Sequence, residues 1–481
     1  MRLARRDILI LAIAAALVVG VYLVVANFIY TIGFPLDDSW IHQTYARNLA
    51  LLREWSFIPG KPSAGSTAPL WTFLLAVGFF LPSAPYLWTF LLGGLLLFAV
   101  ALLAEGIFRR AYPAYMPRLP WVGLFFLVEW HLIWAAVSGM ETLLHILVVT
   151  AVLGLLIAGS RRYWLLGLLT GVSIWVRPDG LTLLGPLLLF VWLVENEMSA
   201  RLRAFTQLAV GFTTLFALYL LFNLMISGMP MPNTFYAKQA EYAEWPLYTR
   251  LRDYFIQFFA GPSLVVLVGI VQKTISAVRR REWGVPLAVV WLLGYILLYL
   301  FRLPAYQHGR YLMPAMSIFL LIGLMGFYEF LPSLRTYRTR LARQAALTAI
   351  VMFSLMFAGY GATVYANDVA VIETQMVESA KWAAQNIPPG ELIAAHDIGA
   401  LGFFDRHDII DLAGLISPEV VPFMRDETKL AAYMDEKNVS YFVAFPKWHP
   451  NLSKRGTVVF ETSERFAEED DNMTIYRWNK P

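Results

Sequence analysis

Two adjacent carboxylates mark the most distinctive stretch of this sequence, FPLDDSWIHQTYARNLA at residues 34–50. Asp37 and Asp38 follow a long apolar run, and helical spacing would place His42 one turn beyond Asp38. Carboxylate and imidazole groups are the side chains that most often move protons in enzymes. The structural alternative is a helix N-cap, a role that needs only one of the two acids. The pair therefore predicts that one carboxylate caps the helix while the other faces a cavity beside His42.

The composition indicates that most of the chain lies in a membrane. Of the 481 residues, 58% are hydrophobic and only 15% are charged, whereas soluble proteins carry about 25% charged residues. The net charge of +4 is small, and basic residues cluster in short loops, a pattern of membrane topology rather than of nucleic-acid binding. Without cysteine the chain can form no disulfide, thiolate metal site or catalytic thiol.

The basic loops predict the orientation of the chain. Arg2, Arg5 and Arg6 precede an apolar stretch from about residue 8 to 32 that is too long for a signal peptide, so we expect an uncleaved first span with a cytoplasmic N-terminus. Residues 67–82 must then lie at the outer interface, because Arg109 would otherwise emerge on the outer side. This leaves eleven spans. The alternative is a twelve-span protein in which one loop has the reversed charge pattern. The predicted spans besides the first are 86–108, 119–137, 140–159, 163–177, 181–195, 204–226, 254–275, 284–301, 310–332 and 343–365.

This topology places the unusual polar motifs on the outer side of the membrane. Ionisable groups near membrane depth are costly and usually mark function, so convergence of several motifs predicts a site at the outer surface. The motifs are PLDDSW (35–40), SGMETLLH (138–145), WVRPDG (175–180), PMPNTFYAK (230–238) and YQHGRY (306–311).

The domain organisation follows from the hydrophobic pattern. Residues 1–365 are predicted as an α-helical polytopic membrane domain, with amphipathic and interfacial helices in a first external loop at 31–85. Residues 366–481 alternate strand-like and helix-like segments, so we expect a small extracytoplasmic α/β domain. DIGALGFF in this domain lacks the GxGxxG spacing of dinucleotide sites, which favours a lid or docking role.

Taken in order along the chain, these motifs resemble the GT-C glycosyltransferases. LDDSWIHQTYARNLA, SGMET, VRPDG, MPNTFYAK and HDIGALGFF…IIDLAGL are most similar to the terminal arabinofuranosyltransferase branch of mycobacterial cell-wall assembly. The resemblance implies transfer of a sugar from a polyprenyl-phosphate donor to a cell-envelope glycan or glycolipid, on the outer face of the cell membrane. It also implies that the acids of the first external loop lie at the active site.

Glycosyl transfer needs a base for the acceptor hydroxyl and stabilisation of the departing phosphate. We favour Asp38 as the base or a metal ligand, beside His42, and Asp37 as the cap or second ligand. Carboxylates of this kind suit a divalent cation such as Mg²⁺, Mn²⁺ or Ca²⁺. Phosphate binds guanidinium and ammonium groups, and the cations predicted on the outer side are Arg177, Lys238, His308 and Arg310, with Arg310 or Lys238 on the phosphate.

The remaining candidate substrate-binding residues could instead have purely structural roles. Arg177 could pair with Asp179 instead of the substrate, and Glu141 is either an acid at a helix N-terminus or a group that contacts the sugar. Asn233 and Tyr236 would hydrogen-bond sugar hydroxyls, although PNT is also a turn signal.

Two other functional classes fit parts of the pattern. A lipid or sugar transporter would also have many spans and intramembrane charges, but transporters tend to show internal repeats and sites at the bilayer midplane. A non-catalytic assembly protein could bind glycan through its outer domain. The intact acidic pair with its surrounding cations favours the transferase.

Overall fold

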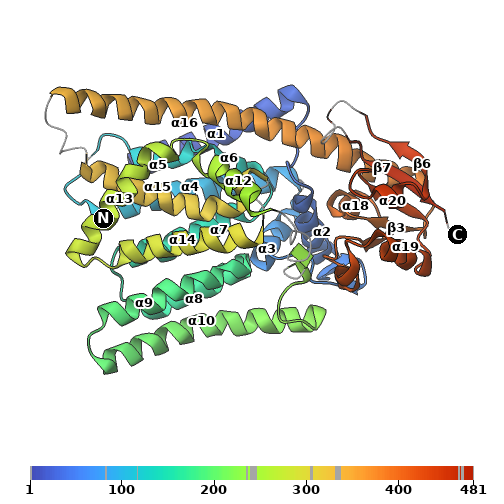
Figure 1. The fold of residues 1–481 in the computed structure, drawn as a ribbon, viewed down its shortest axis with the longest axis horizontal. Helices are drawn as coiled ribbons and strands as arrows, with labels where there is room; N and C mark the ends of the chain where they lie inside the picture. Colours follow the sequence, from blue (N-terminus) through green and yellow to red (C-terminus); the bar gives the residue numbers. More distant parts are fainter. Residues whose placement is uncertain are drawn as a thin grey trace.

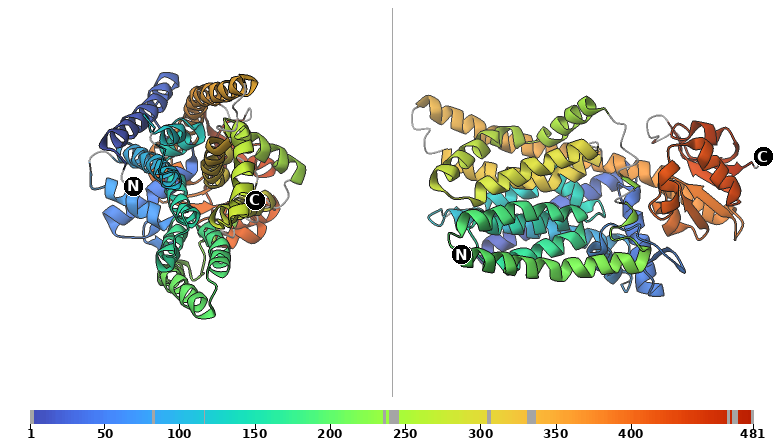
Figure 2. Two further views of the ribbon diagram at one scale, coloured as in Figure 1. Left: turned by 90° about the vertical axis from the view of Figure 1, so that its left-hand side faces the viewer. Right: turned by 60° about the horizontal axis from the view of Figure 1, so that its bottom comes forward.

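The computed structural model shows a bundle of helices with a small α/β domain at one end (Figures 1 and 2). The N-terminus lies at the end of the bundle opposite this C-terminal domain. The structure describes residues 3–81, 84–115, 117–234, 237–238, 246–303, 307–330, 337–463, 466 and 471–479.

The bundle is built almost entirely from helices. Up to residue 227 the elements are α1 (Arg5–Ile29), α2 (Asp37–Leu52), β1 (Ser56–Ile58), β2 (Lys61–Pro62), α3 (Pro69–Gly78), α4 (Tyr86–Ala111), α5 (Trp121–Leu127), α6 (Trp130–Val137), α7 (Thr142–Ile157), α8 (Tyr163–Val176), η1 (Pro178–Leu183), α9 (Leu184–Val194) and α10 (Met198–Ser227). The later elements are α12 (Leu247–Phe259), α13 (Ser263–Arg280), α14 (Gly284–Arg302), η2 (Gln307–Leu312), α15 (Met313–Phe330) and α16 (Tyr337–Ile372).

Helices occur at all of the predicted spans. Six described helices are long and apolar enough to cross a membrane, and the pair α12–α13, bent by 91°, would make a seventh. The remaining predicted spans are the shorter helices α7, α8 and η1–α9 and the broken pair α5–α6. The multi-pass helical membrane fold is thus confirmed, whereas the number of spans and their orientation remain predictions.

Over its described residues, 67–81, the segment predicted to lie at the interface contains the short helix α3 and no other helix. This helix has 10 residues, so at 1.5 Å per residue it is about 15 Å long, half the thickness of a hydrocarbon core of about 30 Å. Pro69 stands at its first position, where the missing N–H costs nothing.

The core of the bundle lies around α15, which is buried from Met313 to Phe327. The sequence of α15 is apolar around its whole circumference, as expected of a helix surrounded by other helices. Gly326 lets α13 approach closely, because a side chain there would overlap the carbonyl oxygen of Gly269. On the outer helix α1, by contrast, Leu17 and Phe28 are exposed, as suits a lipid-facing surface.

The predicted C-terminal α/β domain is present. Its strands are β3 (Leu392–Ala395), β4 (Asp408–Asp411), β5 (Tyr441–Ala444), β6 (Gly456–Glu461) and β7 (Thr474–Trp478), in the order β4-β3-β5-β7-β6. Strands β4, β3 and β5 are parallel, and β7 is antiparallel to both β5 and β6. The helices of this domain are α17 (Glu378–Asn386), α18 (Gly399–Phe404), η5 (Pro418–Phe423), α19 (Glu427–Glu436) and α20 (Pro450–Ser453).

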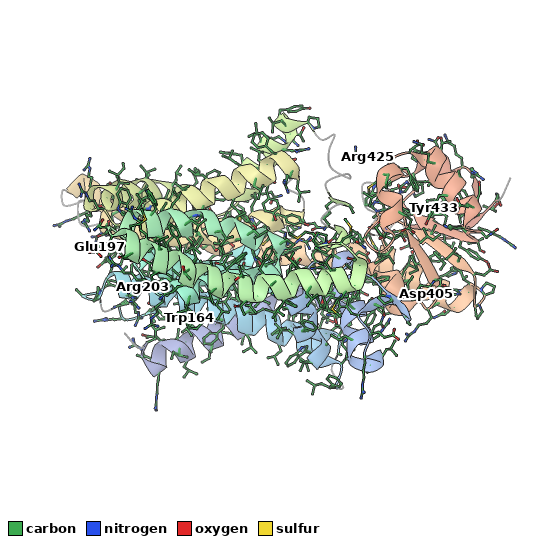
Figure 3. The ribbon with its side chains drawn as sticks, turned by 90° about the horizontal axis from the view of Figure 1, so that it is seen from below. Trp164, Glu197, Arg203, Asp405, Arg425 and Tyr433 are labelled. Carbon is green, nitrogen blue, oxygen red and sulfur yellow. The ribbon has the colours of Figure 1, made fainter. Side chains whose placement is uncertain are left out.

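A continuous helix joins the two parts of the chain. The predicted boundary at residue 365 falls inside α16, which runs through a π-helical turn at Glu373–Val377 into α17. Figure 3 shows Glu197 and Arg203 at the end of the bundle far from the domain that carries Asp405 and Tyr433.

Candidate active site

A cavity of about 320 Å³ lies where the bundle meets the C-terminal domain. Small-molecule sites in proteins usually enclose about 300–1,000 Å³. Each of the five polar motifs contributes at least one residue to its lining, and Leu415 of the C-terminal domain completes the wall. The charged and imidazole side chains of the lining are Asp38, His42, Glu141, Arg177, Asp179, Lys238, Arg302 and Arg310.

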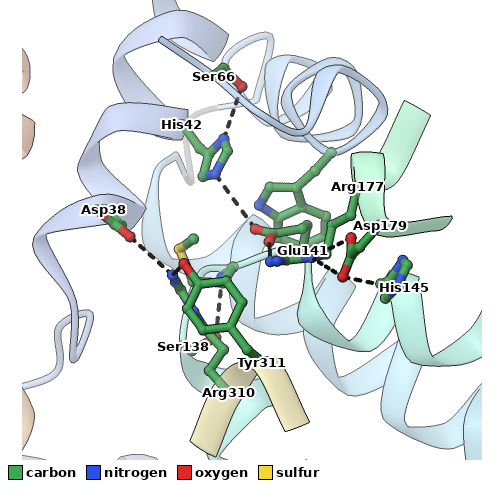
Figure 4. Close-up of polar contacts among 12 residues, drawn as sticks. Asp38, His42, Ser66, Ser138, Glu141, His145, Arg177, Asp179, Arg310 and Tyr311 are labelled. Atoms are coloured by element: carbon green, nitrogen blue, oxygen red, sulfur yellow. Dashed lines mark hydrogen bonds and ion pairs between the residues drawn. The ribbon is translucent and has the colours of Figure 1, made fainter. Parts of the chain in front are cut away.

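The carboxylate of Asp38 faces Arg310 (Figure 4), and Lys238 lies beside it. Its Oδ2 accepts a hydrogen bond from Nη2 of Arg310 at 3.0 Å and lies 3.5 Å from Nζ of Lys238. Burial opposes ionisation, but Lys238 and Arg310 outweigh it and hold the pKa of Asp38 well below its usual range. Asp38 lies in the first turn of α2, whose N-cap is the extended residue Leu36.

Arg310 is the most buried cation of the lining, with a side chain only 2% exposed. Its Nη2 also donates to the hydroxyl of Tyr311 at 3.0 Å, and Nζ of Lys238 donates to the same hydroxyl at 3.0 Å. Among the described residues, Nε and Nη1 of Arg310 have no hydrogen-bond partner. Buried donors in this state are uncommon, so the guanidinium offers two N–H groups to a bound acceptor.

An unusual backbone turn presents Arg310 to the cavity. Gln307, His308 and Gly309 have φ angles of 53°, 54° and 67°, a left-handed conformation that is unfavourable for residues other than glycine. Nε2 of His308 lies 2.8 Å from Oδ2 of Asp368 in α16. His308 therefore contacts α16 and is not part of the cavity lining.

Glu141 and Arg177 form a buried ion pair. Nη1 of Arg177 donates to Oε1 of Glu141 at 2.6 Å, and its Nε donates to Oδ1 of Asp179 at 3.1 Å. Asp179 also accepts hydrogen bonds from the hydroxyls of Tyr295 and Tyr299 at 2.5 and 2.6 Å. The salt bridge considered for Arg177 is thus present, and the same guanidinium also lines the cavity.

His42 lines the cavity but pairs with a different acid from the one that its spacing suggested. Its Nε2 lies 3.5 Å from Oε2 of Glu141, and its Nδ1 lies 3.1 Å from the hydroxyl of Ser66. No hydrogen bond between His42 and Asp38 occurs in this described region. Helical spacing was enough to place His42 beside this cavity, whereas its hydrogen-bond partner depends on tertiary contacts.

The candidate residues of the 230–238 motif are only partly in the site. Asn233 is buried, and its backbone N–H donates to the carbonyl of Ala64; its side chain is not in the lining. The next residue, Thr234, does line the cavity, and its hydroxyl lacks a partner among the described residues. Lys238 is in the lining as well, and Tyr236 lies outside the described residues.

Asp37 contacts the C-terminal domain instead of the cavity. Its Oδ2 accepts a hydrogen bond from the backbone N–H of Gly399 at 2.6 Å, and its Oδ1 from that of Ala400 at 2.8 Å. Asp37 therefore caps α18, not its own helix, and neither acid makes a side-chain cap hydrogen bond in the described first turn of α2. Burial and the nearby carboxylate of Asp397 raise the pKa of Asp37 to about 7.

The donor set around Asp38 does not fit the predicted divalent cation. Its carboxylate faces Arg310 and Lys238, and the carboxylate of Asp37 is bound by backbone N–H groups. The described residues contain no group of three or more His, Asp or Glu side chains suited to a metal ion. The metal stays a prediction, and no step below depends on it.

Sequence reasoning missed several lining residues. Arg302 stands at the end of the apolar helix α14, where an arginine usually reflects only the orientation of the helix in the membrane. Tyr299 could not be distinguished from the many other aromatic residues in the predicted spans. Leu415 belongs to another domain, and its position depends on how that domain docks. Tyr311 and Thr234, by contrast, belong to motifs that the sequence analysis singled out.

Comparisons with known proteins identify the fold of the chain. The chain is similar to ArnT from Cupriavidus metallidurans, in the crystal structure bound to undecaprenyl phosphate, with 14% identity, a TM-score of 0.60 and coverage of 98% of both chains. The apo structure of ArnT gives 16% identity, a TM-score of 0.59 and coverage of 97% of both chains. ArnT is a GT-C glycosyltransferase, and this chain has the GT-C fold.

Three further comparisons are less informative. The mycobacterial arabinofuranosyltransferase AftD is similar at 14% identity and a TM-score of 0.45, over the whole of this chain but 42% of its own; such a score supports no conclusion about this protein. Residues 362–476 match DUF8728, a domain of unknown function. No curated protein matches the sequence.

Proposed function

We propose that this protein is a membrane glycosyltransferase that takes its sugar from a polyprenyl-phosphate carrier. The acceptor is a glycan or glycolipid of the cell envelope, and transfer takes place on the outer face of the cell membrane. Asp38 acts on the acceptor hydroxyl, and Arg310 with Lys238 binds the phosphate of the donor.

The observation that carries this proposal is the state of Arg310. Its guanidinium is buried, yet Nε and Nη1 lack partners among the described residues. Lys238 lies beside it, and Arg302 adds a further positive charge to the cavity lining. A buried arginine with free donors and a neighbouring ammonium group is suited to a phosphate, which accepts charge-assisted hydrogen bonds through several oxygens.

The same contacts suggest how phosphate binding activates the base. Without donor, Arg310 and Lys238 lower the pKa of Asp38 and make it a weak base. A phosphate bound to Arg310 and Lys238 offsets their positive charge near Asp38. The pKa of Asp38 then rises, and its carboxylate accepts a proton more readily. The acceptor oxygen then forms the new glycosidic bond as its proton passes to Asp38, while the bond from the sugar to the phosphate breaks.

The fold comparison supports the carrier class. ArnT, whose fold this chain shares along nearly its whole length, was crystallised with undecaprenyl phosphate. A long apolar carrier suits a cavity in a bundle with many lipid-facing side chains, because its chain can remain in the bilayer while its phosphate enters the cavity.

Binding of undecaprenyl phosphate tests the proposal without knowledge of the sugar. The purified protein in lipid nanodiscs should bind this lipid, as measured by native mass spectrometry. Arg310→Gln should weaken binding about tenfold or more, because a charge-assisted hydrogen bond contributes about 1.5–3 kcal/mol. Arg455→Gln, which removes a cation on the C-terminal domain, is the matched control and should bind normally. Equal affinity in both variants, at unchanged melting temperatures, would refute the phosphate site.

A further inference from the structure

A second group of polar side chains lies in the C-terminal domain, at the carboxyl ends of its parallel strands. The loop after β3 leads through α18 to β4 on one side of β3, whereas the loop after β5 leads through α20 toward β6 on the other side of β5. Strands β3 and β5 therefore flank a topological switch point, where the loops diverge from each other. In open α/β sheets this is the place at which ligands usually bind.

Side chains from both loops meet at this point. His396 and Asp397 follow β3, whereas Trp448 and His449 follow β5. The ring centroid of His396 lies 5.2 Å from that of Trp448 and 5.6 Å from that of His449. Nδ1 of His396 is 3.7 Å from Oδ1 of Asp397. We refer to these four residues as the switch-point cluster.

The switch-point cluster contains buried polar atoms that have no hydrogen-bond partner among the described residues. Oδ2 of Asp397 and Nε2 of His449 are buried atoms with no hydrogen-bond partner among the described residues. The side chain of His449 is nearly enclosed, at 7% exposure, while Trp448 is 43% exposed beside it. Buried polar atoms are rarely left unpaired, so these two are suited to groups of a ligand.

The charge and hydrogen-bonding groups of the switch-point cluster indicate which class of ligand it can bind. Asp37 and Asp397 disfavour an anion, since both are carboxylates near the start of α18. The cluster does not provide a metal-binding set among the described residues. A hydroxyl can donate to Oδ2 of Asp397, an imidazole nitrogen can exchange a hydrogen bond with a second hydroxyl, and the apolar face of a sugar ring can stack on an exposed indole.

We infer that the switch-point cluster binds a neutral carbohydrate chain, and, on the basis of the proposed function, that this chain is part of the acceptor. The location supports this assignment. The loop after β4 contributes Leu415 to the catalytic cavity, and α18 begins at Gly399, whose N–H binds the residue adjacent to Asp38. A glycan held by Trp448 and Asp397 is thus bound by the same domain that closes the cavity.

Saturation-transfer NMR on the full-length protein in nanodiscs tests this inference directly. The probes are a neutral arabinofuranose hexasaccharide, a neutral mannose hexasaccharide and an anionic galacturonate hexasaccharide. At least one neutral probe should bind, and Trp448→Ala and Asp397→Asn should each raise its Kd about tenfold or more. Tyr433→Ala is the matched control, because Tyr433 contacts Phe423 and Glu419 outside the cluster, and it should bind like the wild type.

The results separate this inference from the proposed transferase function. Binding of neither neutral probe, stronger binding of the galacturonate, or unchanged Kd in both cluster variants would overturn it. Binding of undecaprenyl phosphate, measured on the same nanodiscs, tests the donor site independently. Loss of lipid binding with saccharide binding retained would refute the transferase alone, and the reverse result would refute the carbohydrate site alone.

Discussion

Asp37 and Asp38 are adjacent in the sequence, but different parts of the molecule bind their carboxylates. Asp37 accepts backbone N–H groups of Gly399 and Ala400 in the C-terminal domain, whereas Asp38 faces Arg310 in the cavity. The first turn of α2 therefore links the docking of the C-terminal domain to the position of the carboxylate proposed as the base.

The contact of Asp37 with the C-terminal domain should make stability depend on pH. Burial and Asp397 raise the pKa of Asp37 to about 7, above the ordinary value of about 3.9. The folded state therefore binds more protons than the unfolded state between these values, and stability should fall as pH rises from about 4 to 7. The melting temperature of the wild type should fall more steeply over this range than that of Asp37→Asn. Parallel profiles would show that Asp37 has no such shift.

Arg177 should matter for stability as well as for the site. It neutralises the buried carboxylates of Glu141 and Asp179, so Arg177→Gln should cost about 3–5 kcal/mol, the usual effect of breaking a buried ion pair. Arg455→Gln removes a partly exposed pair with Asp435 and should cost at most about 1 kcal/mol. Melting temperatures in one detergent provide the comparison. A wild-type value for Arg177→Gln would mean that the pair contributes little.

His308 should act on the lipid through Arg310. Its contact with Asp368 holds a left-handed turn directly before Arg310, and a left-handed residue other than glycine costs about 1–2 kcal/mol. His308→Ala should release the turn and weaken undecaprenyl phosphate binding about tenfold, the equivalent of 1.4 kcal/mol. His131→Ala provides the control, because His131 in α6 pairs with the N-cap residue Glu129, outside the cavity lining. Normal lipid affinity in His308→Ala would exclude this positioning role.

Cysteine labelling can test the orientation, because the natural chain contains no cysteine. Pro59→Cys lies in an exposed loop near the C-terminal domain, and Ala158→Cys lies in an exposed turn after α7. An impermeant maleimide added to intact cells should label the first position, and the second should react only after permeabilisation. The opposite pattern would contradict the predicted topology.

Local sequence signals were sufficient for the elements of the fold. Apolar length predicted where helices occur, and the alternation after residue 366 predicted a small α/β domain, because both depend on nearby residues. The continuity of α16 into α17 was missed, since the predicted last span was ended at residue 365, where the hydrophobic pattern changes.

Most charged residues of the cavity lining were predicted from the sequence, whereas most of their pairing was not. Asp38, Arg177, Lys238 and Arg310 were found because charges in short motifs near membrane spans are costly. The contact of Asp37 with α18 joins residues 362 positions apart, and one sequence gives no signal for such a pair. The same limit explains why His42 was assigned to Asp38 rather than to Glu141.

Sugar transfer by Asp38→Asn is the most direct test of the central claim. The assay supplies membranes with their native polyprenyl-phosphate donors and measures labelled sugar transferred to envelope acceptors. Asp38→Asn should remain folded, with a cooperative melting transition, and should bind undecaprenyl phosphate at least as well as the wild type, because an anionic competitor for Arg310 is removed. Transfer should fall about 10²–10⁴-fold, the usual contribution of general-base catalysis, whereas Asp37→Asn should retain much more activity. Near-normal transfer by Asp38→Asn would contradict the assignment of this cavity as the active site.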